Sequence, residues 1–193
     1  MGYTTDFNGE FMLDKPLTPA DLEFLTKFSG TRRMGRKVDA KYGVEGEFYC
    51  ENTEDAGQVH EDNIIDFNRP PKTQPGLWCQ WVPNDDGTAI QWDGNEKFYD
   101  YITWIEYLIK AILAPRGYSL TGKVHWQGEE SDDKGKIVIK NNKVKVLKRG
   151  YVYFSGQGTR TRKRVKRTPL QELAWIDKRI QELKTKKKKL ANG

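Results

Sequence analysis

The chain has 193 residues, of which 33 are Lys or Arg and 27 are Asp or Glu. Residues 147–193 hold 15 of the basic residues and three of the acidic ones, so the tail carries +12 and residues 1–146 carry −6. Basic residues packed this densely repel one another and need solvent or a polyanion around them. The tail therefore indicates a polyanionic partner, and nucleic acid is the simplest one.

The composition also excludes several classes of protein. An aromatic content of 12% is too high for a mainly disordered chain, and a body of this length can bury a core. The longest apolar stretch, Ile102–Leu113, contains Glu106 and Lys110 and is too short to cross a bilayer. The N-terminus lacks the features of a signal peptide. We therefore expect a cytoplasmic protein that does not bind membranes.

The first half of the body begins with two elements that have clear signals. Residues Tyr3–Leu13 alternate between polar and apolar types, which predicts a strand. Thr18, followed by a proline and by Asp21, predicts a helix start, and Ser29-Gly30 marks its end. Residues 42–76 read as a long loop with one short strand at Gly46–Cys50.

The second half of the body predicts a hairpin, a helix and a meander of strands. The hairpin is expected at Leu77–Val82 and Thr88–Trp92, the helix at Glu96–Leu113, and the strands at Gly122–Gln127, Lys136–Lys140 and Lys143–Lys148. This order predicts an α+β fold. Its antiparallel sheet would carry two helices on one face, in a split βαβ-like arrangement with extra strands.

Three regions follow from these patterns. Residues 1–147 form the α+β body, residues 148–167 a basic linker, and residues 168–193 an amphipathic helix with a lysine-rich end. Alternating Thr, Arg and Lys can donate hydrogen bonds along a phosphate backbone. We therefore predict nucleic-acid contacts from Arg160, Arg162, Lys163, Arg164, Lys166, Arg167, Lys186, Lys187 and Lys188. The alternatives are a solvated linker and an acidic protein surface.

The C-terminal helix also suggests a protein contact. Its apolar seam recurs at three- and four-residue steps and includes Leu173, Ile176, Ile180 and Leu183. A helix of a partner protein or of a second copy of the chain could pack on this seam. The seam could equally pack on the body itself, and the sequence leaves the oligomeric state open.

A third candidate site lies in the body. The long loop brings polar side chains close to the aromatic hairpin, which suggests a nucleotide-sized pocket lined by Arg69, Trp78, Trp81 and Trp92. The alternative is that these rings belong to the core.

No catalytic motif is present. The acidic turn at Glu129–Asp133 lacks the ligand order of a calcium loop, and the two histidines and two cysteines have no ligand spacing. We therefore predict no catalytic residue, no cofactor and no metal.

Several motifs resemble a known family. They are Gly2–Phe11, Phe28–Met34, Asn68–Pro83, Trp92–Tyr99 and Gly122–Glu130. Over residues 2–146 the chain resembles a family of hypothetical proteins from bacteria and bacteriophages. The resemblance implies a bacterial or phage cytoplasm and carries over no site residues, and the basic tail lies outside it.

The sequence thus favours a non-enzymatic, nucleic-acid-associated protein, in a ribonucleoprotein or in a complex between phage and host proteins. It does not separate RNA from DNA. The alternatives are a protein-interaction module that acts through the C-terminal helix and a body that binds a small ligand or nucleotide.

Overall fold

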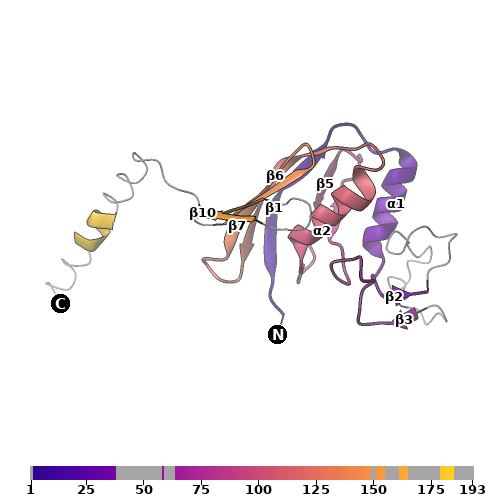
Figure 1. Ribbon diagram of the computed structural model, residues 1–193, viewed down its shortest axis with the longest axis horizontal. Coiled ribbons are helices and arrows are strands. Elements are labelled where there is room, and N and C mark those ends of the chain that lie inside the picture. Colours follow the sequence, from indigo (N-terminus) through magenta and orange to yellow (C-terminus); the bar gives the residue numbers. More distant parts are fainter. Residues whose placement is uncertain are drawn as a thin grey trace. The chain divides into compact units, whose positions relative to one another are not determined.

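The computed structural model describes residues 2–37, 58, 64–148, 151–154, 161–164 and 179–184 (Figure 1). The predicted strand at Gly46–Cys50 and most of the predicted loop lie outside these residues. Two compact units are present, Met1–Arg162 and Lys163–Gly193. The described part of the first unit is an α+β structure, as the element order predicted.

The main sheet has eight strands, and six of them follow the order β8-β7-β6-β1-β5-β4 with antiparallel pairing. Strand β1 (Thr5–Leu13) is central, between β5 (Ala89–Trp92) and β6 (Leu120–Gly128). It pairs with β6 over its whole length. The predicted N-terminal strand is therefore confirmed, and it organises the sheet.

The first helix, α1 (Pro19–Gly30), begins and ends where the sequence predicted. The Thr18 hydroxyl accepts a hydrogen bond from the backbone N–H of Asp21 at 3.2 Å, and Pro19 occupies the first helical position. At the other end the N–H of Thr31 donates to the carbonyl of Phe28.

The predicted hairpin is present, but its first strand, β4 (Trp81–Pro83), begins at Trp81 and not at Leu77. Strand β4 pairs with β5, and Asn84 organises the turn between them. The Asn84 Oδ1 atom accepts hydrogen bonds from the N–H groups of Thr88 and Ala89, at 2.8 and 3.0 Å.

The prediction that the second helix begins at Glu96 is wrong. Helix α2 (Tyr101–Tyr107) begins after Lys97 and Asp100, whose φ angles of 61° and 55° are incompatible with a helix. It continues directly into the π-helical segment η3 (Leu108–Leu113), which ends where the sequence predicted. The Ala114 N–H reaches back five residues to the Ile109 carbonyl at 2.9 Å.

The strand meander is confirmed, with its first two strands longer than predicted and its third strand at the predicted bounds. Strands β6, β7 (Lys134–Lys140) and β8 (Lys143–Lys148) are joined by short turns, and Asn141 and Asn142 turn the chain with φ angles of 48° and 64°. The remaining elements are β2 (Gly35–Arg36), β3 (Ile64–Asp66), β9 (Tyr151–Phe154) and β10 (Thr161–Arg164). Strands β2 and β3 form a separate small sheet, and β9 and β10 follow β8 in the order of the main sheet. Residues 179–184 are helical.

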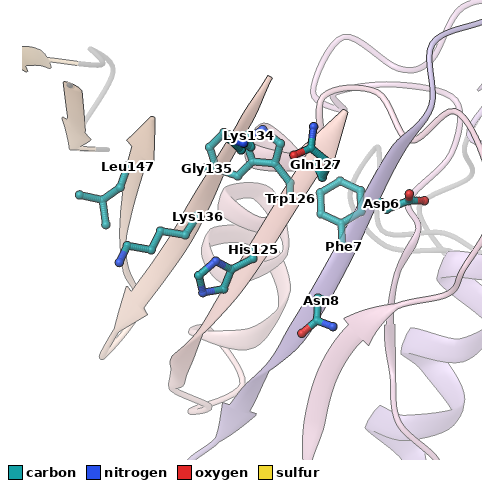
Figure 2. Close-up of a pocket in the computed structure, with 10 residues that line it drawn as sticks. All are labelled: Asp6, Phe7, Asn8, His125, Trp126, Gln127, Lys134, Gly135, Lys136 and Leu147. Atoms are coloured by element: carbon teal, nitrogen blue, oxygen red, sulfur yellow. The ribbon is translucent and has the colours of Figure 1, made fainter. Parts of the chain in front are cut away.

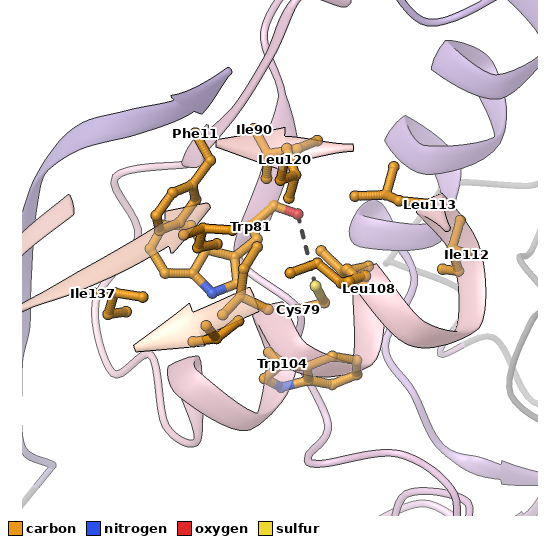
Figure 3. Close-up of a cluster of buried hydrophobic side chains, with 14 of the residues drawn as sticks. Phe11, Cys79, Trp81, Ile90, Trp104, Leu108, Ile112, Leu113, Leu120 and Ile137 are labelled. Carbon is orange, nitrogen blue, oxygen red and sulfur yellow. Dashed lines mark hydrogen bonds between the residues drawn. The ribbon is translucent and has the colours of Figure 1, made fainter. Parts of the chain in front are cut away.

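The core lies between the helices and one face of the sheet (Figure 3). Both helices contribute to it, with Phe28 from α1 and Trp104 from α2 fully buried. The strands contribute Phe11, Leu120, Val124, Ile137 and Ile139. Burying each such side chain contributes about 1.5–3 kcal/mol to stability, so this cluster fixes the register of the strands.

Candidate nucleic-acid interface

The opposite face of the sheet is solvent-accessible and rich in lysine. On β6, β7 and β8 alternate residues face the core and most of them are buried, among them Val124, Ile137 and Val146. Because side chains alternate along a strand, the residues between them point away from the core. The charged or titratable residues on these outward positions are Lys123, His125, Lys134, Lys136, Lys140, Lys143 and Lys145. We call this set the lysine face.

Strand register arranges the face in rows. Asn8 pairs with His125, His125 with Lys136, and Lys136 with Leu147, so one row crosses four strands. Figure 2 shows this row, with His125 and Lys136 extending from neighbouring strands. A hollow of ≈ 630 Å³ lies over it. The next row pairs Lys123 with Val138, and Val138 with Lys145.

The charge on this face is poorly balanced. No ion pair among the described residues involves Lys123, Lys134, Lys136, Lys140 or Lys143. Lys140 lies directly opposite Lys143 across the ladder, and like charges in that position repel. On β1 the outward acidic residues are Asp6 and Glu10. The face therefore has a positive potential that a bound anion would relieve.

One end of the face is bounded by acidic groups. The carboxylate of Asp133 is 2.7 Å from the ammonium of Lys148 and accepts a 2.9 Å hydrogen bond from the Tyr3 hydroxyl. The hydrogen bond from Lys148 lowers the pKa of Asp133, against the opposing effect of partial burial, and Asp133 in turn raises the pKa of Lys148. Lys148 is thus neutralised locally and does not belong to the lysine face.

The predicted nucleic-acid residues of the tail are only partly described. Arg162, Lys163 and Arg164 lie in β10, which is next to β9 in the sheet order. The other predicted residues, Arg160, Lys166, Arg167, Lys186, Lys187 and Lys188, lie outside the described residues. Of the predicted partner seam, Ile180 and Leu183 are helical and 43% and 53% exposed, and Leu173 and Ile176 lie outside the described residues.

The residues of the predicted ligand pocket have different environments. Trp81 is 1% exposed, and its Nε1 donates to the Tyr101 carbonyl at 2.7 Å. It is a core residue, as the alternative interpretation expected. Trp92 is partly buried and donates to Gln80 Oε1 at 3.2 Å. Trp78 is 40% exposed, and the Arg69 side chain is 85% exposed, 3.8 Å from Asp66.

Within the described ranges, no group of three or more His, Cys, Asp or Glu residues could hold a metal ion. The thiol of Cys79 is buried against the Trp81 carbonyl, which its Sγ approaches to 3.7 Å (Figure 3). Burial raises its pKa to about 12, so it is neutral and a poor nucleophile. Cys79 therefore acts as a small core residue.

The sequence prediction placed the cations that would contact nucleic acid in the tail and did not include the lysine face. The signal was present in Lys134–Lys148, where lysine alternates with Ile, Val and Leu. That pattern predicted strands, but the side chains on their polar side were not considered together. Only the pairing of β6, β7 and β8 brings them onto one surface.

Comparison of the chain with protein-family models, curated proteins and solved structures gave no match. None of the helices in the described part of the chain is both long and apolar enough to cross a bilayer.

Proposed function

We propose that this protein binds nucleic acid without catalysing a reaction, and that its lysine face and basic tail contact the phosphates. The observation that carries the proposal is the set of five face lysines that form no ion pair among the described residues. Phosphate groups would supply the missing negative charge. Each contact releases counterions from the nucleic acid, which makes the binding favourable and salt-dependent.

The topology is compatible with this use of the sheet. We assign the fold to the split βαβ arrangement with extra strands, on the basis of two features. The order β6-β1-β5-β4 places α1 and α2 in the two crossovers, and both helices contribute to one core cluster. The face opposite that cluster is then left for a ligand.

A salt titration of the full chain tests the proposal. The test variant is Lys123→Gln with Lys136→Gln and Lys143→Gln, and the matched control is Lys72→Gln with Lys97→Gln and Lys110→Gln. Both remove three positive charges, and of these six lysines all are exposed except Lys136, which is half-buried. We expect the test variant to lose affinity for RNA and DNA and the control to keep most of it. Equal affinities for the two variants would contradict a role for the face.

We place this activity in the bacterial or phage cytoplasm that the family resemblance implies, within a ribonucleoprotein or a phage–host complex. The sequence motifs support this placement, and recovery of the protein with nuclease-sensitive particles from infected cells would test it. Free protein that sediments identically before and after nuclease treatment would contradict it.

The second candidate function is binding of a partner protein through the C-terminal helix. Ile180 and Leu183 favour it because both are exposed and lie about one helical turn apart. We expect Ile180→Asp with Leu183→Asp to abolish pairing with a partner helix and to leave the melting temperature of the body unchanged. Gln181→Asp with Lys184→Asp is the matched control on the same helical segment.

A further inference from the structure

We infer that the lysine face binds a nucleic-acid duplex and contacts its backbone without reading its bases. This inference rests on the proposed function and specifies its ligand. It comes from the kinds of side chain on the face, as well as from their charge.

Phe, Tyr and Trp are absent from the outward positions of β1, β6, β7 and β8, where the one ring is the His125 imidazole. The other outward residues without Lys, Asp or Glu side chains are Asn8, Met12, Thr121, Gln127, Val138 and Leu147. Proteins that bind single strands stack successive bases on aromatic side chains, at about 1–3 kcal/mol for each base. In a duplex the bases already stack on one another and the phosphates face outward. On a surface whose one ring is an imidazole, a duplex therefore keeps its base stacking, whereas a single strand finds no series of rings on which to stack its bases.

The face has few of the groups that make the most specific base contacts in a groove. Its cations are lysines, and arginine, whose planar fork makes bidentate contacts to guanine, is absent from the same outward positions. Of the two outward amides, Asn8 and Gln127, the Gln127 amide is held by the turn, where its Nε2 donates to the carbonyls of Gly128 and Glu130 at 2.8 and 2.9 Å. The side chains of the face are therefore better suited to contacts with phosphates than to recognition of a base sequence.

The lysines also form a two-dimensional patch. Neighbouring strands are about 4.8 Å apart and outward residues on one strand about 6.8 Å apart. The patch from Lys123 on β6 to Lys145 on β8 is thus roughly 10 Å wide, and from Lys136 to Lys140 it is roughly 13 Å long. It can contact phosphates on both sides of a groove that is about 6 Å wide. A single backbone would follow one line and leave some of the lysines without a partner.

The test compares one sequence in three forms, single-stranded DNA, duplex DNA and duplex RNA, each about 20 nucleotides or base pairs long. Full-length protein and the two triple variants described above are titrated at equal phosphate concentration and several salt concentrations. We expect wild-type protein to bind at least one duplex about tenfold more tightly than the single strand. In the variant with Lys123→Gln, Lys136→Gln and Lys143→Gln, the slope of the logarithm of the binding constant against the logarithm of the salt concentration should become less negative by about 2.7. This is about 0.9 for each of the three lost phosphate contacts.

Two further measurements complete the design. Two duplexes of unrelated sequence should bind equally well, since no base is read. A variant with Lys123→Arg, Lys136→Arg and Lys143→Arg keeps the three positive charges and should retain affinity. It therefore distinguishes a loss of binding caused by lost charge from one caused by misfolding.

The possible failures differ. Binding that depends on the face but is equally tight or tighter for the single strand overturns the duplex inference and leaves the proposed function intact. A face variant that behaves like the matched control for every nucleic acid overturns both.

Discussion

Asp21 joins the start of α1 to the turn before β6. Its carboxylate accepts hydrogen bonds from the hydroxyls of Thr18 and Tyr118, at 2.7 and 2.6 Å, and Arg116 Nε lies 3.4 Å away. Partial burial disfavours the charge, but these contacts outweigh it and hold the pKa of Asp21 below its ordinary value of 3.8. The ionised carboxylate therefore stabilises the fold above pH 3.8, and this contribution is lost as the pH falls through the lowered pKa.

We accordingly expect Asp21→Asn to lower the free energy of unfolding by about 1–2 kcal/mol at neutral pH. The difference from wild type should shrink as the pH falls below 3.8. Urea denaturation over a series of pH values measures it. Asp86→Asn, at an exposed turn position, is the control, and a pH-independent difference for Asp21→Asn would contradict the argument.

Gly9 is a second residue whose environment fixes its identity. Its φ angle is 108°, and a Cβ atom there would press on the backbone carbonyl of Lys123. We expect Gly9→Ala to destabilise the protein by at least about 2 kcal/mol, from backbone strain together with the clash. Gly30→Ala is the matched control, since nothing lies within 4 Å of its added Cβ, and it should be neutral. Thermal unfolding of both variants decides the point.

At the scale of elements, the β4–β5 hairpin depends on one amide. Asn84 accepts two backbone hydrogen bonds, and its Nδ2 also donates to the Thr88 hydroxyl at 3.0 Å. Asn84→Ala removes all three and should destabilise the protein by about 2 kcal/mol. Asp85→Ala changes the adjacent exposed position and should alter the melting temperature much less. Similar losses for both would show that the turn composition, rather than the Asn84 amide, matters.

The elements also show where sequence reasoning succeeds. Helix α1 was predictable to the residue because Thr18, Pro19 and Asp21 form a local start signal. The start of α2 was not, because Phe98 continues the apolar stripe and is buried at 3% exposure, although it precedes the helix. The spacing of apolar residues indicates which residues are buried, but it does not indicate the left-handed backbone conformation of Lys97 and Asp100. The lysine face was not predicted for a related reason. Its lysines come together on one surface only when β6, β7 and β8 pair, and a pattern within one strand does not show which strands pair.

At the scale of the whole molecule, the net charge of −6 on residues 1–146 conceals a positive surface. The proposed function has two sources of phosphate contacts, the face and the tail. We expect Arg160→Gln with Arg162→Gln and Arg164→Gln to lower the salt slope by up to about 2.7. If face and tail contact the same nucleic acid independently, combining both triple variants should lower it by the sum of the two separate changes. A combined change equal to either one alone would contradict independent contacts.

The central position of β1 also affects how the protein can be made. Thr5 and its partner Gly128 are more than one hundred residues apart in the chain, so the ribosome synthesises β1 well before β6. At about 5–20 residues per second, β1 has no β6 beside it for on the order of ten seconds. During that interval its apolar residues, Phe7, Phe11 and Leu13, can contact only the part of the core that α1, β4, β5 and α2 supply. The nascent chain therefore leaves one edge of a half-apolar strand unpaired, and co-translational chaperones have a defined segment to protect until β6 pairs with it.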